Sequence, residues 1–150
     1  MAPKAILTPI VGWGAMTITL DALGSGAGRQ SDMETNSGEY PAALIDLKLS
    51  PGTAPTADSI YELYLLRGDD SGNRTDNAGA SDAAFTPRNA RLIGTLRNPG
   101  STADVQEIFD TRFLGPLGGE WGVAVWNATN QALDSADNFI NFTYYNPEIQ

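Results

Sequence analysis

The amino-acid sequence predicts an all-β fold: an antiparallel β-sandwich of jelly-roll or Greek-key type with an extended N-terminal arm. Short segments rich in β-branched and aromatic residues alternate with clusters of Gly, Pro, Asn and Asp, which is the pattern of strands and turns. The chain of 150 residues contains 16 Gly and 9 Pro, and we find no convincing helical segment. Seven or eight strands with uneven spacing favour a sandwich over a simple meander.

The sequence divides into an arm over residues 1–13 and a single β-sandwich domain over residues 14–150. Pro3 and Pro9 interrupt the arm, because Pro lacks a backbone donor and favours extended geometry in the residue before it. A frayed terminus is the alternative, but the arm is too apolar for a solvated tail, so we expect it to dock on a neighbouring molecule. Its candidate interface residues are Ile6, Leu7, Ile10, Val11 and Trp13.

Within the domain, alternation of apolar and polar residues marks the strands, because successive side chains of a strand point to opposite faces. Met16, Ile18 and Leu20, for example, share one face of the first predicted strand. The segment 29–34 has one large apolar residue and is predicted to form a short edge strand. The predicted strands are 14–23, 29–34, 40–49, 60–66, 91–97 and 105–113, followed by a closing pair.

The closing pair lies between Gly118 and Tyr145. Residues 121–126 and 139–145 are rich in aromatic and β-branched residues, and the polar segment between them predicts two antiparallel strands joined by a loop. Both faces of both strands are largely apolar, so we expect them inside the sandwich or in a subunit contact. A sugar-stacking platform is the alternative role, less favoured than packing, for Trp121, Trp126, Phe142, Tyr144 and Tyr145.

Charge and composition exclude several classes of function. The net charge of −9 disfavours direct binding of nucleic acid, because that binding needs Lys and Arg against the phosphates. The chain has no Cys, so it can fold in a reducing cytoplasm without disulfides. No apolar segment approaches the ~20 residues that span a bilayer, so we expect no membrane partner. With neither His nor Cys, we predict no enzyme, no catalytic residue and no cofactor.

Residues 67–88 form a long predicted loop rich in Gly, Asp and Asn, and loops of this length are usually functional. We predict that the loop makes a polar contact with a partner through Arg67, Asp69, Asp70 and Arg74. Its carboxylate and amide oxygens suit Ca²⁺, but the EF-hand spacing is absent. We therefore predict no metal site and leave a bound cation in this loop as an open alternative.

Two stretches of the chain resemble small structural proteins of tailed bacteriophages. Ala15-Met-Thr-Ile-Thr-Leu20, followed by Gly-Ala-Gly-Arg-Gln-Ser31, is similar to the start of such proteins. Gly119-Glu-Trp-Gly-Val-Ala-Val-Trp-Asn-Ala-Thr129, followed by Ala132-Leu133, is similar to their end. The resemblance lies mainly in these two ends and leaves the middle of the chain unmatched. Several proteins of this kind are capsid cement, or decoration, proteins.

The resemblance implies a virion structural protein that carries no catalytic residue. Such a protein is a β-sandwich, often trimeric, which is made in the host cytoplasm and bound to the capsid exterior. It binds the major capsid protein and stabilises the shell by bridging neighbouring capsomers, and we expect a homo-oligomer with a trimer favoured. The alternative is a carbohydrate- or receptor-binding β-sandwich of a phage tail or fibre, which would place the aromatic residues at the surface.

Overall fold

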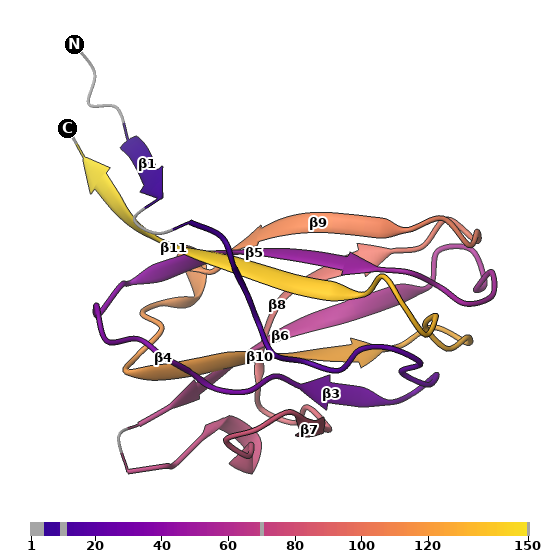
Figure 1. The fold of residues 1–150 in the computed structure, drawn as a ribbon, viewed down its shortest axis with the longest axis horizontal. Helices are drawn as coiled ribbons and strands as arrows, with labels where there is room; N and C mark the ends of the chain where they lie inside the picture. Colours follow the sequence, from indigo (N-terminus) through magenta and orange to yellow (C-terminus); the bar gives the residue numbers. More distant parts are fainter. Residues whose placement is uncertain (1–4, 10–11, 70, 150) are drawn as a thin grey trace.

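The computed structural model describes residues 5–9, 12–69 and 71–149, which are almost entirely β-structure. Two antiparallel sheets pack against each other, which confirms the predicted all-β sandwich (Figure 1). The first sheet has the order β1 (Ala5–Pro9), β11 (Phe139–Ile149), β5 (Ala42–Leu49) and β9 (Val105–Asp110), with β2 (Gly14–Ala15) also paired to β11. The second has the order β7 (Ala83–Ala84), β3 (Gly28–Gln30), β10 (Glu120–Asn127), β6 (Ile60–Gly68) and β8 (Arg91–Arg97), with β4 (Glu34–Thr35) also paired to β10. The jelly-roll or Greek-key type stays a prediction.

The core lies between the two sheets and is built by the inward faces of their central strands. On β5, Ile45, Leu47 and Leu49 are fully buried, and the residues between them are half-buried, as the alternation predicted. Trp121 of β10 and Tyr61 of β6 are among the largest fully buried side chains and belong to the same cluster. Each large apolar side chain stabilises the fold by about 1.5–3 kcal/mol when it is fully buried, so this layer holds the sheets together.

The two closing strands form where they were predicted, but they do not pair with each other. β10 pairs with β6, with Trp121 opposite Arg67, whereas β11 pairs with β5, with Ile140 opposite Leu47. The polar segment between β10 and β11 carries the chain from one sheet to the other, so the predicted hairpin is wrong. The two strands contribute to opposite walls of the core, which explains why each has an apolar inner face.

The long segment between β6 and β8 covers the outer face of the second sheet. Phe85 of this segment forms a second apolar cluster with Leu66 and Ala124, which point away from the main core. The Asp76 carboxylate accepts hydrogen bonds from the backbone N–H groups of residues 88–90, each at 2.8 Å. The described part of the predicted long loop is therefore held by contacts within its own chain.

The strand predicted at 14–23 is wrong beyond its first two residues, which form β2. Met16 is buried as the alternation predicted, but its N–H donates to the Ile140 carbonyl of the first sheet at 2.9 Å. The next carbonyl, of Thr17, accepts from the Asp32 N–H beside the second sheet at 2.8 Å. The segment thus bridges the two sheets instead of extending one of them.

Two other predicted strands are shorter in the structure. The segment 29–34 is divided between β3 and β4, and β3 lies between β10 and β7, so it is not an edge strand. β9 ends at Asp110, because the Thr111 hydroxyl accepts from the Ala43 N–H at 2.9 Å and a 3₁₀ turn follows at Arg112–Leu114. The strands predicted at 40–49, 60–66 and 91–97 are confirmed as β5, β6 and β8.

Of the residues predicted to form an N-terminal arm, Ala5–Pro9 form β1, which makes a two-stranded ribbon with the end of β11; the arm itself stays a prediction. β1 pairs antiparallel with the end of β11, from Ala5 opposite Ile149 to Pro9 opposite Tyr145. β1 and the end of β11 extend together beyond the rest of the sandwich (Figure 1). The ribbon and the sandwich are continuous through β11, which pairs with β5 over residues 139–145.

Candidate functional site

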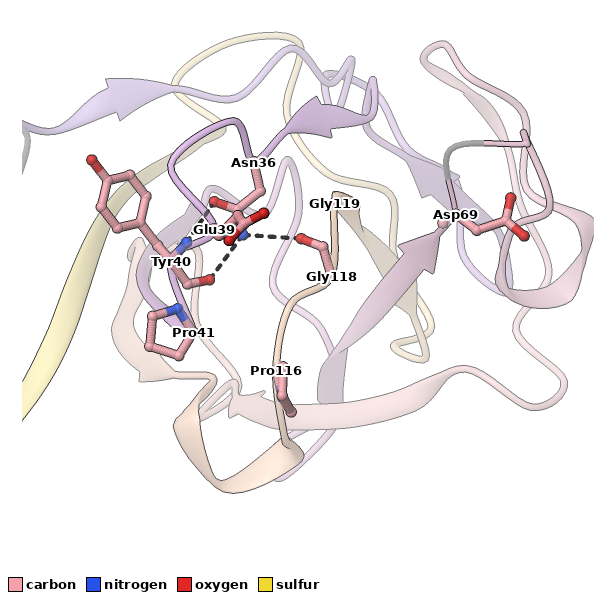
Figure 2. Close-up of a pocket in the computed structure, with 9 residues that line it drawn as sticks. Asn36, Glu39, Tyr40, Pro41, Asp69, Pro116, Gly118 and Gly119 are labelled. Carbon is pink, nitrogen blue, oxygen red and sulfur yellow. Dashed lines mark hydrogen bonds between the residues drawn. The ribbon is translucent and has the colours of Figure 1, made fainter.

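At one end of the sandwich, three segments lie together: the one before β5, the one after β6 and the one before β10. Asn36 is 3% exposed and connects two of them: its Nδ2 donates to the carbonyls of Tyr40 at 2.8 Å and Gly118 at 2.9 Å. Its Oδ1 accepts from the Tyr40 N–H at 3.0 Å. These three segments surround a hollow of about 660 Å³ (Figure 2). Figure 2 shows the Tyr40 ring directed away from Asn36, out of this network.

Arg67, which was predicted to contact a partner, holds a turn of its own chain. Its Nε donates to the Pro116 carbonyl at 2.7 Å, and its Nη2 donates to the carbonyls of Leu114 at 2.6 Å and Gly115 at 3.1 Å. Burial, together with the charge of Arg91, lowers the pKa of Arg67 below its ordinary value. The guanidinium satisfies three carbonyl groups at once and thereby fixes the turn that follows β9.

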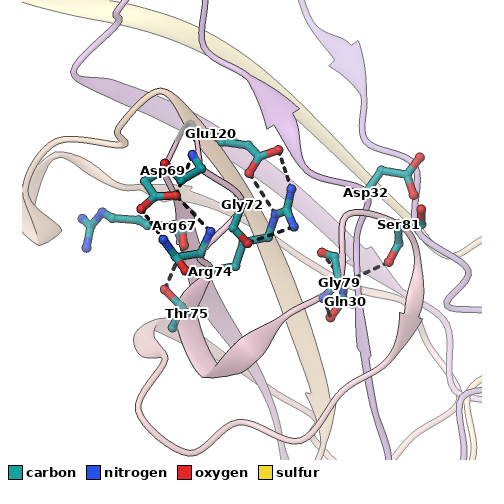
Figure 3. A network of polar contacts seen from close by, with 12 residues as sticks. Gln30, Asp32, Arg67, Asp69, Gly72, Arg74, Thr75, Gly79, Ser81 and Glu120 are labelled. Carbon is teal, nitrogen blue, oxygen red and sulfur yellow. Dashed lines mark hydrogen bonds and ion pairs between the residues drawn. The ribbon is translucent and has the colours of Figure 1, made fainter.

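Arg74 and Asp69 are also engaged within the chain (Figure 3). Arg74 makes a two-pronged ion pair with Glu120, with N–O distances of 2.8 Å and 2.9 Å. Asp69 accepts hydrogen bonds from the Asn73 side chain and from the backbone N–H groups of Asn73 and Ser71, and these bonds lower its pKa. Both charges stabilise the segment after β6, and their contact with a partner stays a prediction.

Three of the remaining predicted interface residues are described, and they lie in the ribbon or shortly after β1 in the chain. Ile6 and Leu7 lie in β1, which pairs with β11. Trp13 lies just before β2 and is 48% exposed, which fits a contact with a partner. Three further predicted interface residues lie outside the described part of the chain: Ile10, Val11 and Asp70.

A second hollow, of about 360 Å³, is lined by aromatic rings, and we call it the aromatic hollow. Tyr40 lines both hollows, and Phe142 and Tyr144 of β11 line only this one. The ring centroids of Tyr40 and Tyr144 are 4.8 Å apart, and the Tyr144 hydroxyl accepts from Trp121 Nε1 at 2.9 Å. Burial raises the pKa of Tyr144 above its ordinary value, and its hydroxyl is engaged by the buried Trp121 indole.

The five aromatic residues considered as a sugar platform are mainly packing residues. Trp121 and Tyr145 are 0% and 1% exposed, and Trp121 belongs to the main core. Trp126, Phe142 and Tyr144 are half-buried. Phe142 and Tyr144 alone combine contact with the core and access to the aromatic hollow.

The 3₁₀ turn after β9 presents an exposed ring that is not among the predicted interface residues. Phe113 is 78% exposed, and the guanidinium carbon of Arg112 lies 4.5 Å from the centre of its ring. Arg112 Nε lies 2.9 Å from one carboxylate oxygen of Asp110, and the buried Tyr145 hydroxyl donates to the other. The sequence predicts one strand over 105–113, which puts Phe113 at the end of that strand. The Gly115-Pro116 dipeptide nearby is a turn signal and indicates that the strand ends earlier.

Over the described ranges, no group of three or more His, Cys, Asp or Glu side chains is placed to hold a metal ion. In the same part of the chain, no helix has the length and apolar character needed to cross a bilayer. A scan against protein-family models finds no match, and no curated protein matches the chain. The function is therefore inferred from the geometry of the chain itself.

Proposed function

We propose that this chain is a cement, or decoration, protein of a bacteriophage virion. In this role it binds the major capsid protein on the outer surface of the shell, bridges neighbouring capsomers and catalyses no reaction. It is made in the host cytoplasm, assembles as a homo-oligomer with a trimer favoured, and then joins the capsid exterior. The observation that most supports the proposal is the ribbon of β1 and β11 that extends beyond the sandwich (Figure 1).

The ribbon has the properties of a docking element. Residues 139–145 of β11 pair with β5, whereas residues 146–149 have β1 as their partner among the described strands. An isolated pair of strands is marginally stable in water, so the ribbon gains stability when another surface covers it. Among the described strands β1 is the last of the first sheet, so one row of its backbone N–H and C=O groups faces outward and can pair with a neighbouring strand.

A contact of this size suits a protein that binds a shell in many copies. Stable complexes between two proteins usually bury about 1,200–2,000 Å² in total, which is more than one short ribbon supplies. An oligomer that places several ribbons on neighbouring capsomers links these weak contacts, and linkage raises the overall affinity by roughly 10²- to 10⁴-fold. The proposed bridging of capsomers and the small contact of each ribbon therefore support each other.

Deletion of residues 1–11 tests the ribbon. The deletion removes β1 and leaves β11 paired with β5, so circular dichroism should still show a folded β-protein. We expect the full chain to saturate capsids that lack it in a co-sedimentation assay, and the truncated chain to remain in the supernatant. The matched control is Asp58→Asn, an exposed change in the loop between β5 and β6, which should bind as wild type.

The co-sedimentation assay tests the docking role of the ribbon separately from the cement function. Normal capsid binding by the truncated chain would refute the docking role of the ribbon while keeping the cement function. Failure of the full chain to bind capsids at any concentration would refute the cement function itself.

The aromatic hollow supports a second candidate function, carbohydrate or receptor binding in a phage tail or fibre. Sugars stack on aromatic rings, and the rings of Tyr40, Phe142 and Tyr144 surround a hollow of suitable size. Trp121 donates to the Tyr144 hydroxyl, so its fluorescence should report a bound glycan. A saturable change in fluorescence that Tyr40→Ala abolishes would favour the tail or fibre function. Unchanged fluorescence across a panel of glycans would exclude glycan binding.

A further inference from the structure

Phe113 is the most exposed large apolar side chain in the described part of the chain. Burying such a ring is favourable, and aromatic residues together with Arg are enriched at the centres of protein interfaces. Here the two occur side by side, because the Arg112 guanidinium lies over the Phe113 ring. The turn therefore has the composition of an interface anchor.

Three contacts hold this anchor in place before any partner binds. Arg112 is paired with Asp110, and the Asp110 carboxylate is held from β11 by the Tyr145 hydroxyl. Arg67 fixes the residues that follow Phe113 through three carbonyl groups. An anchor that is already ordered loses little conformational entropy on binding, so more of its burial energy becomes affinity.

The aromatic hollow has the size and lining to receive such a ring. Its volume of about 360 Å³ exceeds what one phenyl ring needs, and Phe142 and Tyr144 offer ring faces and edges for edge-to-face contact. Gly14 lines the hollow without a side chain and leaves it open. Glu39 is exposed and lies in sequence between Gly38 and Tyr40, which both line the aromatic hollow, and Glu39 itself lines the larger hollow that shares Tyr40.

We propose that Phe113 of one copy inserts into the aromatic hollow of a second copy of this chain. Arg112 beside the ring then faces Glu39 beside the hollow, so the charges at the contact are complementary. The Phe113 side chain and the aromatic hollow are different surfaces of the same polypeptide, so the contact is heterologous. When it is repeated, it produces either a closed ring of subunits or an open filament. The inference rests on the homo-oligomer in the proposed function and specifies its contact, but it does not require a capsid.

Two complementary variants test the contact. Phe113→Ala removes the exposed ring, and Gly14→Phe fills the hollow, because a Cβ added at Gly14 meets only one ring carbon of Phe142, at 3.9 Å. In sedimentation velocity without capsids, each variant alone should self-associate at least ~30-fold more weakly than wild type, the loss typical of an interface hot spot. An equimolar mixture should form dimers, because one variant keeps its hollow and the other keeps its ring.

The control is Ile108→Ala on β9, another exposed apolar residue at 53% exposure, which should self-associate as wild type. Near-ultraviolet circular dichroism checks that each variant is folded. If Gly14→Phe misfolds, Glu39→Arg replaces it, because this variant places a positive charge opposite Arg112 of the second copy. A monomeric wild type, an unchanged mass for Phe113→Ala, or a mixture that stays monomeric would overturn the inference. If wild type is monomeric and Phe113→Ala loses capsid binding, Phe113 contacts the shell instead, and the cement function survives without this contact.

Discussion

Replacing Asp82 by Asn should destabilise the sandwich, because one carboxylate joins three distant segments. Its Oδ2 accepts from the N–H of Thr19 at 3.0 Å and from the Thr19 hydroxyl at 2.5 Å, and its Oδ1 accepts from Arg29 Nε at 2.5 Å. Thr19 belongs to the segment that bridges the sheets, Arg29 to β3, and Asp82 itself precedes β7. The Asp82 side chain is 15% exposed and that of Arg29 is 30% exposed, so water replaces these bonds poorly.

The magnitude follows from what Asn retains. Its amide oxygen can still accept from Thr19, but its NH₂ group cannot accept from Arg29, so the charged bond is lost. A hydrogen bond to a charged group contributes about 1.5–3 kcal/mol, and the partial exposure of Arg29 reduces the ionic part. We expect the free energy of unfolding to fall by about 2 kcal/mol and the Tm by about 4–8 °C. The control Asp58→Asn, at a pair with Arg97 that is 65% and 70% exposed, should lose less than ~1 kcal/mol.

The pH dependence of the same pair of variants provides an independent check. Burial raises the pKa of Asp82, but the bonds from Arg29 and Thr19 outweigh burial and lower the pKa below its ordinary value. A carboxyl with a lowered folded pKa stabilises the fold above its unfolded pKa and loses that contribution as the pH falls through the folded pKa. The gap between wild type and Asp82→Asn in urea unfolding should be full at about pH 7 and shrink below about pH 4. Equal losses for both variants, or a gap that does not change with pH, would refute the reasoning.

Two further predictions concern packing and ionisation. Gly94→Val on β8 should lower the free energy of unfolding by about 1–3 kcal/mol, because the added Cβ would lie 2.4 Å from a ring carbon of Phe109; unchanged urea unfolding would show that the ring can move aside. Tyr64 should ionise late in an ultraviolet titration, because burial and its bond to the Glu62 carboxylate raise its pKa to about 12. Tyr64→Phe should remove one late-ionising group, and an identical titration curve in the variant would contradict this assignment.

Alternation along the sequence predicted the central strands well, because they are buried on at least one face. On β5 and β6 the period of two coincides with burial against the core, and both strands lie where they were predicted. The same alternation wrongly predicted a long strand around Met16. Met16 is buried as predicted and its N–H bonds to the first sheet, but the next residue, Thr17, bonds to Asp32 instead. Alternation reports which side of an extended segment is buried, and it carries no information about the strand that will pair with it.

The partners of the closing strands could not be predicted for a related reason. A polar connection fits a hairpin loop and a crossing between sheets equally well, and the choice depends on contacts that are remote in sequence. In the structure the two strands lie in different sheets and face each other, and the Trp121 indole N–H donates to the Tyr144 hydroxyl across the core.

The candidate site was harder to predict than the fold, because the chain uses its charges internally. The place of Arg67 in a polar loop predicts a partner contact, which stays a prediction, whereas its bonds to backbone carbonyls leave no signature in a sequence. Phe113 was overlooked because one apolar residue at the end of a strand resembles core. Its exposure depends on Thr111, which ends the strand by bonding to β5.

Tyr145 lies where the two proposed contacts meet. Its backbone pairs with β5 at Ala42 and with β1 at Pro9, so it stands at the junction of the sandwich and the ribbon. Its hydroxyl donates to Asp110, which is paired with Arg112, and the Arg112 guanidinium lies over the Phe113 ring. A contact between copies that fixes Phe113 therefore also fixes the base of the ribbon, and each subunit then presents its ribbon in a defined direction. Linked weak contacts gain affinity only when their geometry lets them bind together, so the oligomer contact would set the spacing at which the ribbons reach neighbouring capsomers.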